Sequence, residues 1–190
     1  MKPFTRANTQ LLSEIRHVLM TPILRTSDPS TLVFVYVYDI TKGLSNVLSP
    51  ILFGSKITSI YHTSVVVFDT EYFYSSRGII ACRPGTSVLE APDSKIAYGR
   101  FSLNRIAITD WLAQAKTSTF SAENYSLLEH NCNTFSELFL YRLLGASLPD
   151  AIKYQIADIS NTPFGNIWIK LLRSKSVPNV SLFSRGFNLS

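Results

Sequence analysis

Residues 31–38 read TLVFVYVY, and this stretch constrains the fold more than any other part of the chain. β-branched and aromatic side chains suit the pleated surface of a sheet, so the stretch predicts a β-strand. Side chains of a strand alternate between its faces, and here the valines lie on one face and aromatic residues on the other. A strand with two apolar faces needs cover on both. We therefore expect residues 31–38 to form an interior strand of a sheet.

A β-hairpin is expected further along the chain. Residues 57–68 favour a strand, Asp69-Thr70 a turn and residues 71–75 a returning strand. The two-residue period divides the first arm into two faces. One face carries His62, Ser64, Val66 and Phe68, and the other carries Tyr61, Thr63, Val65 and Val67. Shorter strands are expected at residues 79–82 and 97–101.

The remaining patterns are helical. Helices are expected over residues 9–20, 109–116, 134–144, 148–160 and 167–172. Thr109 is the expected N-cap of the second helix, and Thr134 with Glu137 has the capping-box form for the third. Gly145 is expected to end that third helix. Together, these strands and helices predict one α+β domain.

Composition and charge limit the class of protein. The chain of 190 residues is 46% hydrophobic and 16% charged, which suits one folded domain. The net charge of +5 gathers at the ends, because residues 1–30 carry +2 and residues 166–190 carry +4, which leaves −1 between them. A nucleic-acid-binding face on the core is therefore not expected. No apolar run of about 18 residues predicts a transmembrane segment, and no secretory signal is recognisable.

The segment HNCNTF at residues 130–135 concentrates the reactive residue types. The chain's two cysteines, Cys82 and Cys132, do not form a disulfide framework, and the paired spacing of a cysteine zinc site is absent. Cys132 lies at the expected start of a helix. Unpaired N–H groups and the helix dipole at such a position lower a thiol pKa and can hold an oxyanion. Cys132 is therefore a candidate nucleophile.

A nucleophilic cysteine needs a base, and three histidines compete for that role. His17 lies in the N-terminal appendage and is the poorest candidate. His130 lies two residues from Cys132, whereas His62 lies 70 residues upstream on an expected strand. Spacing alone does not choose between them. A buried structural thiol and a hydrogen-bonded structural histidine remain the alternatives.

Longer motifs settle the family to which the sequence is similar. IYHTSVVVFDTEYFYSSRGI at residues 60–79 and YSLLEHNCNTFSELF at residues 125–139 resemble the PPPDE superfamily of papain-like cysteine peptidases. More narrowly, the chain resembles the type-one branch of deSUMOylating isopeptidases. VYDITKGLSNVLSPILFG, APDSKIAYG, LPDAIKY and NTPFG follow in the expected order. The resemblance covers residues 32–173 and leaves the N-terminal extension unaccounted for.

The resemblance implies a circularly permuted papain-like fold, with an antiparallel sheet packed against helices and the catalytic cysteine at a helix N-terminus. It also implies a catalytic dyad of His62 and Cys132, and it favours His62 over His130 as the base. No metal or organic cofactor is then needed. Asp39, Asn131 and Asn133 are candidates for a third, orienting group, and none of them is favoured. Cys82 is expected to be a structural thiol.

The implied activity is removal of SUMO from target lysines by a cysteine isopeptidase. A deubiquitinase or a protein S-depalmitoylase could use the same dyad, and a non-catalytic module that binds modified proteins is a further alternative. The family implies homodimers, and we expect a protein of the cytoplasm and nucleus. The expected organisation is an N-terminal extension at residues 1–30, a peptidase domain at 31–173 and a basic tail at 174–190.

Overall fold

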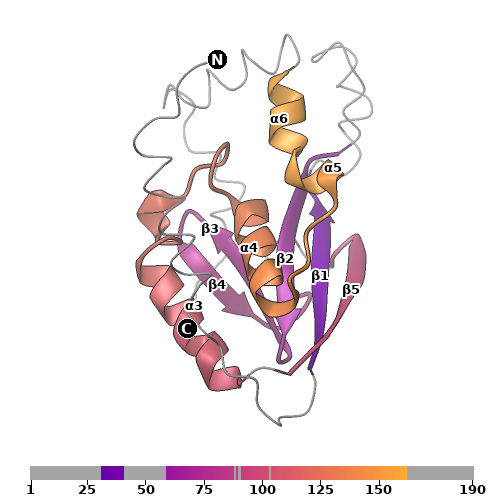
Figure 1. The fold of residues 1–190 in the computed structure, drawn as a ribbon. Coiled ribbons are helices and arrows are strands. Elements are labelled where there is room, and N and C mark those ends of the chain that lie inside the picture. The colour runs from indigo at the N-terminus through magenta and orange to yellow at the C-terminus, as the bar shows by residue number, and fades with distance from the viewer. Residues whose placement is uncertain (1–30, 41–58, 88, 90, 103, 162–190) are drawn as a thin grey trace.

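A computed structural model describes residues 31–40, 59–87, 89, 91–102 and 104–161 (Figure 1). Five strands form one antiparallel sheet in the order β4-β3-β2-β1-β5. The strands are β1 (Thr31–Asp39), β2 (Tyr61–Val67), β3 (Thr70–Ser75), β4 (Gly78–Cys82) and β5 (Ser94–Phe101). The helices are α3 (Arg105–Thr117), the 3-10 turn η1 (Ala122–Asn124), α4 (Cys132–Leu144), α5 (Asp150–Lys153) and α6 (Gln155–Ser160). The α+β class and the antiparallel sheet are confirmed.

Strand β1 is interior, as its sequence predicts, because β2 and β5 flank it. Its valines join the larger apolar core, which contains the buried residues of α3 and α4. On the other face Tyr36 and Tyr38 form a second, smaller cluster with Val66. Both faces of the strand are therefore covered, which explains why the sequence alternates between two kinds of apolar side chain.

The hairpin of β2 and β3 turns one residue earlier than expected. Phe68 and Asp69 occupy the turn with φ angles of 53° and 58°, in place of the expected Asp69-Thr70. Two consecutive positive φ angles are typical of the tight turn that matches the twist of a hairpin. The expected division of faces is confirmed nearby, since the Thr63 hydroxyl reaches α4 while the Ser64 hydroxyl binds Glu71.

Helix α3 begins earlier than the sequence analysis placed it. Asn104 is the N-cap, and its side-chain oxygen accepts a hydrogen bond from the Ile106 amide at 2.8 Å. Thr109, the expected cap, instead lies inside the helix and donates its hydroxyl to the Ile106 carbonyl. The prediction of Thr109 as N-cap was wrong because Asn104 also has a strong capping side chain and meets the first exposed N–H groups.

Helix α4 also begins earlier than expected, at Cys132. Its N-cap is Asn131, whose side-chain oxygen accepts hydrogen bonds from the amides of Asn133 and Thr134. The Thr134 hydroxyl accepts in return from the Asn131 amide, which closes a capping box. The predicted box of Thr134 with Glu137 was therefore wrong in its position. The helix ends at Gly145, with a φ of 67°, as the sequence predicts.

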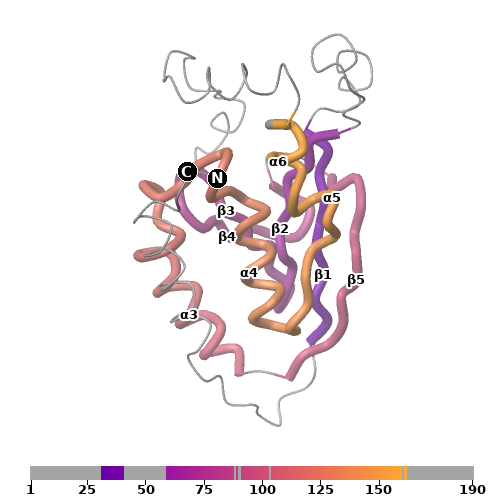
Figure 2. Tube along the Cα trace, turned by 45° about the horizontal axis from the view of Figure 1, so that its top comes forward, coloured from indigo at the N-terminus to yellow at the C-terminus, as the bar shows by residue number. Residues whose placement is uncertain are grey.

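Glu137 takes no part in the capping box. Its side chain instead joins α4 to the segment that follows the helix. Its carboxylate accepts the Leu148 amide at 2.6 Å and the Ser147 hydroxyl at 2.7 Å. The single helix expected at residues 148–160 is two short helices, α5 and α6, which meet at Tyr154. Figure 2 shows α5 and α6 beside the end of β1 and the start of β2.

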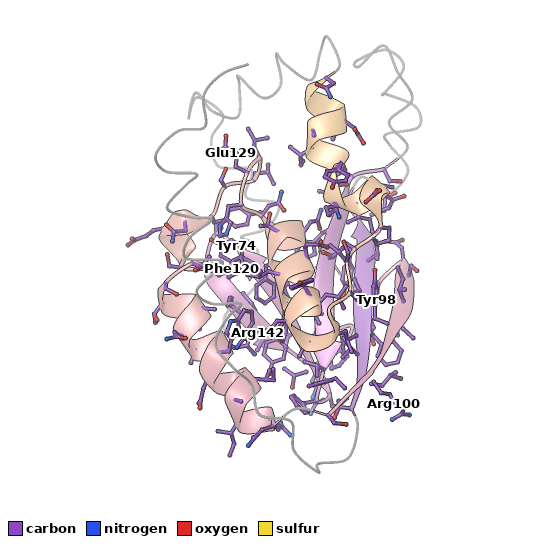
Figure 3. All side chains as sticks on the ribbon, in the orientation of Figure 1. Tyr74, Tyr98, Arg100, Phe120, Glu129 and Arg142 are labelled. Atoms are coloured by element: carbon purple, nitrogen blue, oxygen red, sulfur yellow. The ribbon has the colours of Figure 1, made fainter. Side chains whose placement is uncertain are left out.

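Aromatic packing holds α3 and α4 on one face of the sheet. Phe139 of α4 stacks on Trp111 of α3 at 5.2 Å between ring centroids and meets Tyr72 of β3 edge-on at 5.9 Å. Tyr74 and Phe120 lie together near the start of α4, at 5.0 Å (Figure 3). Among the helices that the described residues form, none has the length and apolar character to span a bilayer. The helices predicted at residues 9–20 and 167–172 lie outside the described residues.

Candidate active site

The site forms where β2 parts from β3. The ladder between these strands covers only Val65–Val67 on the β2 side, so the first residues of β2 extend beyond it. Asp39 lies opposite Tyr61, and the next pair along β1 joins the Ile40 amide to the Ile60 carbonyl at 2.9 Å. Along an antiparallel pair of strands, the backbone N–H and C=O groups of successive residues point alternately toward the partner strand and away from it. The backbone groups of Tyr61 therefore point away from β1, along with those of Thr63.

Side chains from two helices occupy this open edge of β2. Tyr61 donates its N–H to Gln155 at 2.8 Å, and its carbonyl accepts from Gln155 at 2.7 Å and Asn133 at 3.1 Å. Two residues further on, the backbone of Thr63 is near enough to the Cys132 sulfur to lower the pKa of the thiol. The start of α4 thus replaces β3 as the neighbour of β2, and Cys132 lies beside the residue that follows His62.

Asn133 connects the thiol to the strand. Its side-chain oxygen accepts hydrogen bonds from the Thr63 hydroxyl at 2.9 Å and the Cys132 thiol at 3.6 Å. Its side-chain nitrogen donates a hydrogen bond to the Tyr61 carbonyl. Asn133 is buried, so each of these hydrogen bonds replaces one that water would make. Asn133 therefore fixes the strand and the helix start relative to each other.

The imidazole of His62 projects from the opposite face of β2 to the Thr63 hydroxyl. It packs against Tyr38 of β1 at 5.9 Å and edge-on against Phe73 of β3 at 5.6 Å between ring centroids. The contact with Phe73 places the ring over the region where β2 and β3 separate. Only 6% of His62 and 7% of Cys132 are exposed to solvent. Both side chains are therefore mostly withdrawn from water.

Burial holds both groups in their neutral forms. Burial raises the pKa of the Cys132 thiol from 9.0 to about 11, although the backbones of Thr63, Asn133 and Cys132 itself lower it. Burial also lowers the pKa of His62 from 6.5 to about 4. From the sequence, a position at a helix start is expected to lower the pKa of the Cys132 thiol. The helix-start amides do act in that direction, but the desolvation of a buried thiolate outweighs them.

His130 has different surroundings from His62. Its ring stacks on Phe120 at 4.7 Å and 12° between planes, and its Nδ1 lies 3.1 Å from the Asn124 carbonyl. Burial lowers the pKa of His130 as well. This ring belongs to the aromatic packing under the loop before α4, which is the structural alternative considered for a histidine. His17 lies outside the described residues.

The three candidates for an orienting group have distinct partners. Asn131 caps α4 and also donates to the Leu127 carbonyl at 2.9 Å. Asn133 joins the thiol to β2, as described above. Asp39 accepts the Ser59 hydroxyl at 2.8 Å. Asn133 is thus the candidate in contact with Cys132, and Asn131 serves the helix start.

Two residues near the site, Gln155 and Glu71, were not predicted from the sequence. Gln155 lies 94 residues from its partner Tyr61, within a segment whose pattern indicated only a helix. Glu71 is fully buried and accepts the hydroxyls of Tyr38 at 2.6 Å and Ser64 at 2.8 Å, and its second oxygen accepts the Gly85 amide. The one sequence signal that could have indicated a buried role for Glu71 is its place in a strand among apolar residues.

Comparison with known proteins identifies the family. The family model described as "PPPDE putative peptidase domain" matches residues 31–172. The chain belongs to the PPPDE peptidase family. This confirms the resemblance drawn from the sequence motifs and the assignment to the peptidase class of enzymes.

Curated relatives from this family carry a common name. A protein of Xenopus laevis named desumoylating isopeptidase 1 is 37% identical over 154 residues, which is 81% of this chain and 91% of that protein. Proteins of Homo sapiens and Rattus norvegicus with the same name are 40% and 41% identical. The human match covers 74% of this chain and 83% of the relative, and the rat match covers 69% and 78%.

Proposed function

We propose that this PPPDE peptidase is a cysteine isopeptidase that releases SUMO from lysine side chains, with Cys132 as nucleophile and His62 as base. The observation that carries the proposal is the hydrogen bonding of Asn133, whose side-chain oxygen accepts both the Cys132 thiol and the Thr63 hydroxyl and so joins the start of α4 to the strand that bears His62. The names of the relatives support SUMO as the modifier.

The geometry supports a proton transfer between the two side chains. Asn133 accepts both the Thr63 hydroxyl and the Cys132 thiol, so the sulfur is held near the residue that follows His62. The His62 ring lies edge-on against Phe73 of β3, at 5.6 Å between ring centroids. The thiol and the imidazole are thus tied to consecutive residues of β2, through the hydrogen bonds of Asn133 and through the strand itself.

The reaction begins from a neutral pair. Neutral His62 removes the thiol proton of Cys132 as the sulfur attacks the carbonyl carbon of the terminal glycine. The imidazolium then gives that proton to the lysine amine as the C–N bond breaks, which leaves a thioester on Cys132. Water, deprotonated by His62, attacks the thioester, and the proton returns to the departing sulfur. The products are free SUMO and the target lysine.

The capping of α4 limits which backbone N–H groups are free to donate a hydrogen bond to the oxyanion. Asn131 already accepts the amides of Asn133 and Thr134. The amide of Cys132 lies toward its own sulfur and lowers the pKa of the thiol. We therefore assign the Cys132 N–H as a donor to the tetrahedral intermediate, because a backbone N–H at the nucleophile stabilises the oxygen on which charge develops.

The proposal extends to assembly and location on the strength of family resemblance. We infer a homodimer, which light scattering of the purified protein tests directly. We place the protein in the cytoplasm and nucleus, which cell fractionation tests. Residues 31–173 are the proposed peptidase domain, with residues 1–30 and 174–190 as appendages.

The test of function compares four proteins on three substrates. Wild type, Cys132→Ala, His62→Ala and the matched control Cys82→Ala are assayed with fluorogenic C-terminal amides of SUMO and of ubiquitin and with an acyl thioester. We expect turnover of the SUMO amide by wild type and Cys82→Ala, and loss of at least about a thousandfold in the other two. Circular dichroism establishes that each variant is folded.

Each other outcome changes a specific part of the proposal. Turnover of the ubiquitin amide alone makes the protein a deubiquitinase with the same dyad. Turnover of the acyl thioester alone makes it a depalmitoylase. Full activity in folded Cys132→Ala or His62→Ala removes that residue from the dyad, and binding of SUMO without turnover by wild type favours the non-catalytic module.

A further inference from the structure

Gln155 forms an unusual pair with the backbone of β2. Its side-chain oxygen accepts the Tyr61 amide at 2.8 Å, and its nitrogen donates to the Tyr61 carbonyl at 2.7 Å. A primary amide offers one acceptor and one donor side by side, as the neighbouring strand would. Gln155 thus continues the pairing of β2 at the point where β3 has left it. The residue is only 7% exposed, so these hydrogen bonds lie largely out of reach of water.

This pair is linked to both members of the proposed dyad. Tyr61 directly precedes His62, and its carbonyl also accepts the side chain of Asn133, which directly follows Cys132. The hydrogen bonds therefore connect α6, the start of β2 and the start of α4 through one carbonyl oxygen. A displacement of Tyr61 moves His62 along with it and removes a fixed point for Asn133.

We propose that Gln155 is a positioning residue for this site, which holds the start of β2 at the place where His62 and the Thr63 amide meet Cys132. The inference rests on the proposed dyad and adds α6 to the elements that form the active site. Gln155 acts through the backbone of Tyr61 and does not touch the reacting atoms.

Substitutions of Gln155 can remove its two hydrogen bonds to Tyr61 together or remove the donor alone. Gln155→Leu keeps a similar volume and removes both hydrogen bonds. Gln155→Glu keeps the acceptor but places a carboxylate against the Tyr61 carbonyl, where the donor is lost. Protonation of that Glu restores an O–H donor beside a C=O acceptor. Gln114→Leu, the same substitution at an exposed position of α3, is the matched control.

The first measurement is the pH profile of Cys132 alkylation by iodoacetamide, followed on the Cys132 peptide by mass spectrometry. It needs no protein substrate, so its result is independent of whether SUMO is the modifier. The Thr63 amide stabilises the thiolate, so its displacement slows alkylation. We expect Gln155→Leu to react about three- to tenfold more slowly than wild type at pH 8, and Gln114→Leu to react like wild type.

The second measurement is steady-state turnover of the SUMO amide. Misplacement of a catalytic group by about 1 Å can cost on the order of a hundredfold in rate, so we expect Gln155→Leu to lose about ten- to a hundredfold in kcat. The KM should stay within about threefold of wild type, because the Gln155 side chain is buried and paired with the backbone of Tyr61. Gln155→Glu should resemble Gln155→Leu at pH 8 and approach wild type near pH 5, where its carboxyl gains a proton.

The outcomes separate this inference from the proposed function. Wild-type kcat and a wild-type alkylation profile in Gln155→Leu overturn the positioning role and leave the isopeptidase intact. A lower melting temperature with an unchanged alkylation profile assigns Gln155 to stability alone, which also overturns it. If Gln155→Leu does not fold, the pH dependence of Gln155→Glu decides, and a constant ratio to wild type from pH 5 to 8 counts against the inference.

Discussion

At the scale of single residues, burial controls the chemistry of the site. Cys132 lies at a helix start, and the amides around it favour a thiolate. Burial of the thiol nevertheless raises its pKa to about 11, and burial of His62 lowers the pKa of the imidazole to about 4. The resting protein therefore holds a thiol and a neutral imidazole, and in the proposed mechanism the proton is transferred in the step in which the substrate is attacked.

Alkylation of Cys132 tests this resting state. With a pKa of about 11, roughly one thiol in ten thousand is ionised at pH 7. We expect iodoacetamide to modify Cys132 of the wild-type protein at least about a hundredfold more slowly than free glutathione at pH 7, with a rate that climbs about tenfold per pH unit to pH 10. The Cys82→Ala variant isolates the Cys132 signal. A plateau below pH 7 would instead mean a preformed thiolate–imidazolium pair.

His62 also makes stability depend on pH. Its pKa is about 4 in the folded protein against 6.5 in the unfolded chain, so the unfolded state binds more protons below pH 6.5. The free energy of unfolding therefore falls as the pH drops from 6.5 to 4, by about 3 kcal/mol from this group alone. Urea titrations should show this loss in wild type and a smaller one in His62→Gln. All other titratable groups are common to the two proteins, so parallel curves would contradict the prediction.

At the scale of elements, the side chain of Asn131 caps the start of α4. The side-chain oxygen of Asn131 accepts hydrogen bonds from the amides of Asn133 and Thr134, which adjoin the proposed nucleophile Cys132. The helix start must therefore be capped for Cys132 to keep its place against β2. The same side chain also ties the helix to the loop before it, through its hydrogen bond to the Leu127 carbonyl.

Removal of this cap should destabilise the protein. We expect Asn131→Ala to lower the free energy of unfolding by about 1–2 kcal/mol, because two helix-start N–H groups lose their acceptor. Asn131→Asp is the matched variant, since it keeps the acceptor and loses only the donor to Leu127. Denaturant unfolding of both measures the difference. Equal stability of Asn131→Ala and wild type would show that other groups satisfy these amides.

At the scale of the whole molecule, aromatic rings join the helices to the sheet. Phe139 is fully buried and contacts Trp111 of α3, Tyr72 of β3 and Phe135 of its own helix. The layer of helices therefore depends on a side chain that touches three elements. The opposite face of the sheet is covered separately by the tyrosine cluster around Tyr38 and the buried Glu71.

A cavity at Phe139 should weaken the entire fold. We expect Phe139→Ala to cost about 3–5 kcal/mol, since a buried aromatic ring is lost and the site is too well packed to collapse. The melting temperature should fall by roughly 10 °C. Tyr141→Ala on the same helix is the control, because Tyr141 is 53% exposed and its loss should cost under about 0.5 kcal/mol. A similar effect of the two substitutions would contradict the assignment of Phe139 to the core.

The features that were predictable from sequence are those that local physics decides. The alternation of residues 31–38 predicted an interior strand, and the two faces of β2 followed from its period of two. Gly145 marked the end of α4 because a left-handed residue there suits glycine. The long motifs around His62 and Cys132 pointed to the PPPDE family. Each of these signals is carried by neighbours along the chain.

The remaining features depend on which distant residues meet. Two residues near the start of each helix have side chains that can cap it: Asn104 and Thr109 for α3, and Asn131 and Thr134 for α4. In both helices the earlier residue is the N-cap, and this depends on where the folded chain places the first exposed N–H groups. The thiol pKa depends on the balance of burial against backbone amides, which only packing sets. Gln155 pairs with Tyr61 because the ladder between β2 and β3 does not extend to Tyr61 and α6 lies beside this end of β2. The two residues are 94 positions apart, so no local pattern in the sequence encodes the contact.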